Sequence, residues 1–101
     1  MTTNSVKTVE VTTFELKSEV DQELFLKVAE KMEKQFIQKQ DGFIPQTLSV
    51  NEKGVWTDII YWESETAHQN AFKESEKSEE ALPFMNALNF ETVQMNISTI
   101  K

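Results

Sequence analysis

The sequence predicts an α+β fold of the ferredoxin-like kind, with the element order β-α-β-β-α-β. Three observations lead to this prediction. A long helical period of apolar residues fills the first half of the chain, β-rich segments flank it, and a strand near residue 60 runs directly into a second helix. In this arrangement the helices cover one face of a four-stranded antiparallel sheet, and the other face stays open.

The first strand is predicted over residues 7–16, a segment rich in Val, Thr and Phe. Val9 and Val11 alternate with Glu10, whereas Phe14 carries the apolar character to the opposite parity. Either a bulge re-aims the strand or both of its faces are buried.

The first helix is predicted to begin with a capping-box-like segment from Ser18 to Asp21 and to end near Gln40. Gly42 is expected to be the left-handed residue that terminates it. The apolar stripe of this helix repeats every four residues, at Leu24, Val28 and Met32.

The second strand is predicted over residues 43–51, with Ile44, Leu48 and Val50 on one face. Pro45 lacks an amide donor, so we expect this strand to lie at the edge of the sheet. A short turn then leads into the third strand.

The third strand, residues 55–63, carries large apolar groups on both of its faces. One parity holds Trp56, Asp58, Ile60 and Trp62, and the other holds Val55, Ile59 and Tyr61. Helices can hide only one face, and a bare apolar face is uncommon on a monomer. We therefore expect a homodimer that forms through the open face of the sheet.

The remainder of the chain completes the order of elements. Ser64 is expected to cap a second helix that ends near Glu74, and Pro83 lies near the start of a short further helix. The last strand is predicted over residues 91–100. Its alternate residues form an apolar face of Val93, Met95 and Ile97 and a polar face of Gln94, Asn96 and Ser98.

Length and composition narrow the class of protein. A chain of 101 residues suits a single domain, residues 1–101, with a small core. The chain has no cysteine, which excludes disulfides and thiolate metal sites. No apolar run has the length of a membrane helix, and the first seven residues are polar rather than a signal peptide, so we expect a cytoplasmic protein.

The charge balance limits the kind of partner. The formal net charge is -7, and all ten basic residues are lysine. Nucleic-acid binding normally requires a basic face, and arginine is the usual partner of phosphate groups. A neutral small molecule of aromatic or apolar character suits this inventory better, and we expect neither nucleic acid nor a membrane as a partner.

Three short segments carry a resemblance to a known family. Residues 14–17 (FELK), 41–43 (DGF) and 61–64 (YWES) together resemble the dimeric α+β barrel superfamily, in particular the antibiotic-biosynthesis-monooxygenase-like proteins. The similarity spans residues 9–100. It implies two sheets packed face to face in a homodimer, with a small-molecule pocket between sheet and helices in each subunit. Members of the family include cofactor-free oxygenases of polycyclic aromatic substrates and haem-degrading enzymes.

The resemblance transfers only some of the family's functional residues. Trp62 matches a tryptophan that commonly closes the third strand and faces the pocket. Ala71 occupies a position that often carries a histidine, and His68 lies one helical turn earlier. The haem-degrading branch also has an asparagine on the first strand, where this chain has Thr12 and Thr13. We therefore expect no haem, no metal and no other cofactor.

The candidate catalytic residues are Asp58, His68 and Asn96. Asp58 shares its parity with apolar residues, and desolvation there would favour a base poised nearer neutrality; the alternative is that it caps a turn or that the strand faces are reversed. His68 is a candidate base, metal ligand or oxyanion donor, or else a solvent-facing or rim histidine on an amphipathic helix. Asn96 is a candidate oxyanion donor, or a group that bonds across the dimer.

The expected substrate pocket comprises Trp56, Ile60, Trp62 and Phe72. Two functions remain open for it. One is cofactor-independent monooxygenation of an aromatic or quinone-like compound, with Asp58 as base and Trp62 holding the ring. The other is a non-catalytic dimeric module that binds an apolar ligand or serves assembly alone.

Overall fold

The computed structural model describes residues 7–101, apart from the side chains of residues 45 and 46. The prediction that no signal peptide occupies the first seven residues thus falls largely outside the described residues. The elements in chain order are β1 (Thr8–Leu16), α1 (Gln22–Gln35), the short 3-10 helix η1 (Ile37–Lys39), β2 (Phe43–Val50), β3 (Trp56–Trp62), α2 (Glu65–Ser75), α3 (Leu82–Ala87) and β4 (Leu88–Thr99).

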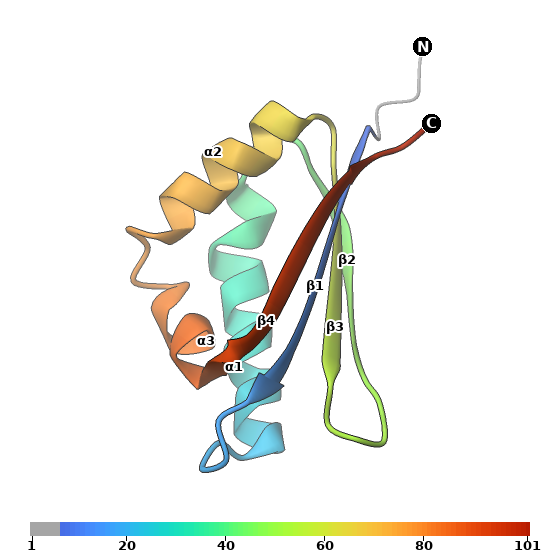
Figure 1. The fold of residues 1–101 in the computed structure, drawn as a ribbon. Helices are drawn as coiled ribbons and strands as arrows, with labels where there is room; N and C mark the ends of the chain where they lie inside the picture. Colours follow the sequence, from blue (N-terminus) through green and yellow to red (C-terminus); the bar gives the residue numbers. More distant parts are fainter. Residues whose placement is uncertain (1–6) are drawn as a thin grey trace.

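The four strands form one antiparallel sheet in the order β2-β3-β1-β4. The helices all lie on one side of this sheet, and its other side is bare (Figure 1). This is the ferredoxin-like α+β arrangement that the element order predicts. The expected edge position of β2 is confirmed as well.

The two faces of the central strands have opposite environments. On β1, Glu10 pairs with Ile60 of β3, and Phe14 pairs with Trp56. These side chains and their neighbours of the same parity are buried beneath the helices, whereas residues of the other parity are half-buried on the open face. The parity that contains Trp56 and Trp62 is therefore the one facing the helices.

The change of pattern along β1 is not a change of face. Thr8, Glu10, Thr12 and Phe14 are all buried on the helix side, although the first three are polar. The pairing of β1 with β4 does shift register between Thr13 and Glu15, which is the bulge that the sequence allowed. The strand β1 itself is fully buried on one face only.

The ends of α1 differ from the prediction. Its N-cap is Asp21, whose carboxylate accepts a hydrogen bond from the backbone N–H of Leu24 at 3.1 Å, so Ser18 is not the cap. The α-helix ends at Gln35, and η1 then carries the chain on to Lys39. Gly42 has the expected left-handed backbone, with φ 81°, but it lies in the turn directly before β2 rather than at the end of α1.

A second register shift divides the predicted face of β2. Ile44 pairs with Tyr61 on the open side, whereas Leu48 pairs with Asp58 and Val50 pairs with Trp56 on the helix side. The prediction that all three apolar residues share one face is wrong, because the irregularity between Ile44 and Thr47 reverses the parity.

The later elements follow the sequence closely. Ser64 caps α2 by accepting a hydrogen bond from the backbone N–H of Ala67 at 3.0 Å. Pro83 lies in the first turn of α3. The strand β4 begins at Leu88 rather than at Glu91, directly after that short helix.

Buried apolar residues form two separate clusters between the sheet and the helices. The first is rich in aromatic rings and consists of Phe14, Phe25, Trp56, Phe84, Ala87 and Leu88. The second consists of Phe36, Ile37, Ile60, Trp62, Ala71 and Ala81. Side chains of both clusters line the cavity described next.

Candidate functional site

A cavity of about 390 Å³ lies between the helix side of the sheet and the three helices. Its walls come from β1, β3 and β4 on the sheet and from α1, α2 and α3 opposite. Most of the lining is apolar, and aromatic rings contribute much of it: Phe14, Phe36, Trp62, Phe72, Phe84 and Phe90. A volume of this size is within the range that holds a small organic molecule.

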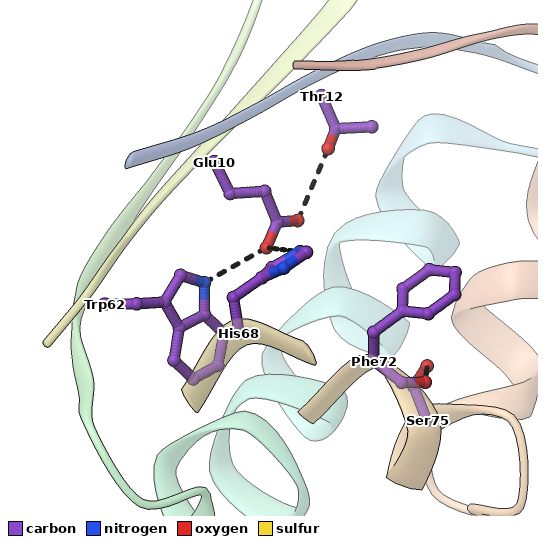
Figure 2. A network of polar contacts seen from close by, with 6 residues as sticks. All are labelled: Glu10, Thr12, Trp62, His68, Phe72 and Ser75. Carbon is purple, nitrogen blue, oxygen red and sulfur yellow. Dashed lines mark hydrogen bonds and ion pairs between the residues drawn. The ribbon is translucent and has the colours of Figure 1, made fainter. Parts of the chain in front are cut away.

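The polar part of the cavity is built around Glu10 of β1. This side chain is buried, with 8% of the residue exposed. One carboxylate oxygen, Oε1, accepts a hydrogen bond from the indole Nε1–H of Trp62 at 3.1 Å. The other, Oε2, accepts one from the hydroxyl of Thr12 at 3.4 Å (Figure 2). Sheet register produces this cluster, since Glu10 and Thr12 follow one another on the same face of β1 and Trp62 lies across on β3.

His68 of α2 reaches the same carboxylate from the helix layer. Its Nε2 lies 3.3 Å from Oε1 of Glu10, and the residue is 8% exposed. Neither ring nitrogen makes a directed hydrogen bond to any residue that the structure describes. The imidazole is in ring contact with Trp62 on one side and with Phe72 on the other, at centroid distances of 6.1 and 6.3 Å. Figure 2 shows the imidazole beside the carboxylate, with Phe72 one turn further along the helix.

Local sequence explains why the histidine arrives there. Ser64 fixes the start of α2 immediately after Trp62, so the helix leaves the sheet at the strand that supplies the indole. His68 and Ala71 are its buried residues and lie on the face turned toward the sheet. The alternative of a solvent-facing histidine is therefore wrong.

Asp58 and Ile60 lie on β3 between the two tryptophans. Both are buried and both line the cavity. Asp58 pairs with Thr12 of β1 in the sheet register and does not lie in a turn, so the alternative of a turn cap is wrong.

The structure brings together most of the candidate residues, with two exceptions. Asp58, Ile60, Trp62, His68 and Phe72 all line the cavity. Trp56 has the same parity, but it belongs to the aromatic cluster and is not part of the lining.

Asn96 lies apart from the site. It pairs with Val11 of β1, which is on the open side of the sheet, so its side chain has the opposite parity to the lining residues Val93 and Met95. The sequence pattern correctly assigns Asn96 to the polar face of β4. The cavity, however, borders the apolar face of that strand, so Asn96 points away from it.

Sequence reasoning overlooked Glu10, although a signal for it was present. Glu10 and Thr12 share their parity with Phe14, and a large aromatic residue at the end of a strand indicates which face is buried. The alternation of Val9 and Val11 with Glu10 left two alternatives open, a bulge or burial of both faces, and neither singled out Glu10.

The opening of the cavity is also apolar. Phe72 of α2 is 44% exposed, Phe90 of β4 is 57% exposed and Met95 of β4 is 40% exposed, and all three belong to the lining. These side chains mark the region where the cavity meets solvent, between α2 and the edge strand β4.

Acidic groups outnumber basic ones around the cavity. The described lining includes Glu10, Glu33 and Asp58, while His68 is its one residue able to carry a positive charge. Within residues 7–101 no group of three or more His, Asp or Glu side chains is arranged to hold a metal ion. None of the helices in that range is long and apolar enough to cross a membrane.

Among known proteins, only solved structures are similar to this chain. No family model and no curated protein matches this chain. A monooxygenase from the gene ActVA-Orf6 of Streptomyces coelicolor, solved in complex with Nanaomycin D, matches with a TM-score of 0.71 and 24% identity over 96% of this chain and 89% of its own. A dimeric ferredoxin-like protein from an uncultured marine organism matches with a TM-score of 0.72 and 16% identity over 95% and 89% of the two chains.

A third similar structure is SnoaB, a cofactor-independent oxygenase from Streptomyces nogalater. Its TM-score is 0.66 at 18% identity, over 95% of this chain and 92% of its own. These similarities extend over nearly the whole of both chains. The predicted resemblance to the antibiotic-biosynthesis-monooxygenase-like proteins is therefore confirmed at the level of the fold.

Proposed function

We propose that this chain is a small-molecule-binding protein whose cavity takes a mainly apolar aromatic compound. The observation that carries the proposal is the cavity of about 390 Å³, lined by aromatic and aliphatic side chains with a few polar groups gathered at Glu10 and His68. Pre-formed apolar cavities with a small number of convergent polar groups are the usual form of a ligand site.

Binding of indole, measured by titration calorimetry, tests this proposal. Ala71 is buried and lines the cavity, so Ala71→Leu fills part of the space and is expected to weaken binding at least about tenfold. Asn70→Leu is the matched control, because Asn70 is the exposed neighbour on the same helix. Equal affinity in both variants and the unaltered protein would show that the compound binds elsewhere, and no binding at all would overturn the proposal.

A second candidate function is cofactor-independent oxygenation of a polycyclic aromatic compound. Two proteins of the same fold are a monooxygenase and a cofactor-independent oxygenase. In such a reaction a ring CH₂ group loses both hydrogens, one atom of O₂ enters the product as a carbonyl oxygen, and the other leaves as water. Asp58 or His68 would accept the first proton, and Trp62 would hold the ring. Asn96 has no part in this version, since it lies on the other face.

Oxygen consumption with an anthrone as substrate tests this second function. Uptake that requires the protein and falls at least about a hundredfold in Asp58→Asn would support Asp58 as the base. Uptake that survives both Asp58→Asn and Trp62→Ala would overturn the mechanism. Binding of indole without any oxygen consumption would exclude the oxygenase function and support ligand binding only.

We also propose that the chain forms a homodimer through the open face of its sheet. The helices leave that face bare (Figure 1), and it carries half-buried apolar side chains at Val9, Val11, Ile59 and Tyr61. A similar solved structure is described as dimeric. Pairing of two such faces would remove apolar surface from water in both subunits.

A further inference from the structure

We propose that the cavity selects an aromatic amine, bound as its ammonium cation by Glu10 and His68. This proposal rests on the proposed ligand-binding function and specifies the chemistry of the polar end of the ligand. Four features of the cavity support it: the acceptor capacity of Glu10, the ring nitrogens of His68, the balance of charges and the aromatic walls.

Glu10 has unused capacity to accept hydrogen bonds. A carboxylate offers about four acceptor positions. Among the described residues, two neutral donors bond to it, the indole N–H of Trp62 on Oε1 and the hydroxyl of Thr12 on Oε2, and Nε2 of His68 lies 3.3 Å from Oε1. Neutral donors stabilise a buried negative charge without cancelling it, and a cation in the cavity would do so.

His68 supplies the second acceptor. Its ring nitrogens make no directed hydrogen bond to the described residues, although the side chain is only 10% exposed. Nε2 lies 3.3 Å from Oε1 of Glu10 but outside hydrogen-bond geometry, so one donor group at the carboxylate would be within reach of both residues. A neutral imidazole accepts one hydrogen bond at its unprotonated nitrogen, and an ammonium group has three N–H donors for the two residues together.

The surrounding charges favour a cation over an anion. Glu33 also lines the cavity on the α1 side, and no lysine belongs to the described lining. The chain as a whole has no arginine and a net charge of -7. A carboxylate ligand placed near Glu10 would face like charge at short range, which is unfavourable in a partly desolvated site.

The aromatic walls suit the same ligand. Trp62 donates its N–H to Glu10 and at the same time lines the cavity, so the polar end of the cavity adjoins its aromatic wall directly. The remaining rings, Phe36, Phe72 and Phe84 among them, provide an apolar environment for the body of the ligand.

Three compounds with one ring system separate charge from shape. Tryptamine, tryptophol and indoleacetate carry an ammonium, a hydroxyl and a carboxylate group on the same indole body. In titration calorimetry at neutral pH we expect tryptamine to bind at least about tenfold more tightly than tryptophol, because hydrogen bonds to charged groups are stronger than neutral ones. Indoleacetate should bind most weakly of the three.

Two glutamine substitutions on one strand locate the effect. Glu10→Gln is expected to bring the affinities for tryptamine and tryptophol to within about threefold of one another, because it removes the charge and retains the shape. Glu15→Gln is the matched control, since Glu15 is an exposed residue of β1, and it should leave the wild-type preference unchanged. If Glu10→Gln does not fold, the order of the three affinities in the unaltered protein decides the proposal.

The outcomes distinguish this inference from the proposal beneath it. Binding of tryptophol or indoleacetate as tight as that of tryptamine would overturn the amine preference and leave the apolar cavity as a ligand site. A preference for tryptamine that persists undiminished in Glu10→Gln would overturn the role of Glu10. Failure of all three compounds to bind would overturn both proposals.

Discussion

Glu10 shows how an acidic strand residue can be accommodated in a buried position. The indole of Trp62 and the hydroxyl of Thr12 donate to its two oxygens, and the imidazole of His68 lies against one of them. A buried carboxylate loses the hydration it would have in water, and such donors replace part of that loss. The cluster therefore depends on each donor, because the removal of one leaves the charge less well satisfied than before.

Trp62→Phe tests this dependence. The phenyl ring retains much of the apolar contact but has no N–H, so we expect the free energy of unfolding in urea to fall by about 1–3 kcal/mol. Combination with Glu10→Gln provides a double-mutant cycle. A coupling energy of about 0.5 kcal/mol or more between the two positions is expected, and simple additivity would contradict the proposed dependence.

At the scale of elements, α2 determines the geometry of the polar cluster. It begins at Glu65, after the N-cap Ser64, and brings His68, Ala71 and Phe72 to the cavity. The start of the helix is fixed by the cap of Ser64 and by close contact with the backbone at Gly42, whose carbonyl accepts a hydrogen bond from the N–H of Glu63 at 2.9 Å. Changes at this junction therefore act on the helix as a unit.

The cap is tested by Ser64→Ala. Loss of the hydrogen bond to the N–H of Ala67 is expected to lower the free energy of unfolding by about 1 kcal/mol. Ser18→Ala is a suitable control, because Ser18 is exposed and Asp21 is the residue that caps α1. Chemical denaturation followed by circular dichroism measures both. A loss of stability in Ser18→Ala equal to that in Ser64→Ala would contradict the assignment of the caps.

The contact at Gly42 is tested by a pair of alanine substitutions. Gly42 and Gly54 both have left-handed backbones, with φ 81° and 83°, so each substitution costs about 1 kcal/mol in backbone strain. A Cβ at Gly42 would lie 2.7 Å from Cβ of Ala67, whereas one at Gly54 would meet nothing within 4 Å. We therefore expect a clearly larger loss of stability for Gly42→Ala in thermal unfolding. Equal losses would show that the contact with α2 is not close in solution.

At the scale of the whole molecule, the sheet separates two surfaces with different tasks. Its helix side borders the two apolar clusters and the cavity between them. Its open side carries the half-buried side chains that we propose to meet in a homodimer. The binding and the assembly that we propose would thus use opposite faces of the same four strands.

The proposed dimer is tested by Ile59→Lys. Ile59 lies on the open face of β3 and pairs with Val11 of β1, so a lysine there places a charge within the apolar area. We expect a dimer for the unaltered protein and a monomer for this variant in analytical ultracentrifugation. Leu26→Lys, at an exposed site on α1, should remain dimeric. A wild-type monomer, or an unchanged dimer in Ile59→Lys, would contradict the proposed interface.

Much of this architecture could be predicted from local pattern. The order of elements, the cap at Ser64 and the shared face of Trp56, Asp58, Ile60 and Trp62 follow from periodicity and turn chemistry. The face of β2 could not be predicted, because a register shift depends on pairing with β3 rather than on the strand's own sequence.

The candidate site was only partly accessible to the same reasoning. Asp58 and Trp62 were found from parity, but Glu10 was not, because polar residues on the helix side of β1 have the appearance of a solvated face. The position of His68 beside Glu10 depends on the docking of α2 against the sheet, a long-range contact that sequence spacing does not give.

The alternation along β1 has a consequence for how the protein can change over time. Glu10 and Thr12 line the cavity, while Val9 and Val11 lie on the open face. A substitution at one of these positions therefore affects one face of the sheet and not the other. If both proposals hold, substitutions at even positions of β1 would change the ligand preference and keep the pairing of subunits, and substitutions at odd positions would do the reverse. An insertion of one residue would exchange the two sets, placing valines against the ligand and a carboxylate between subunits, and both properties would be lost together.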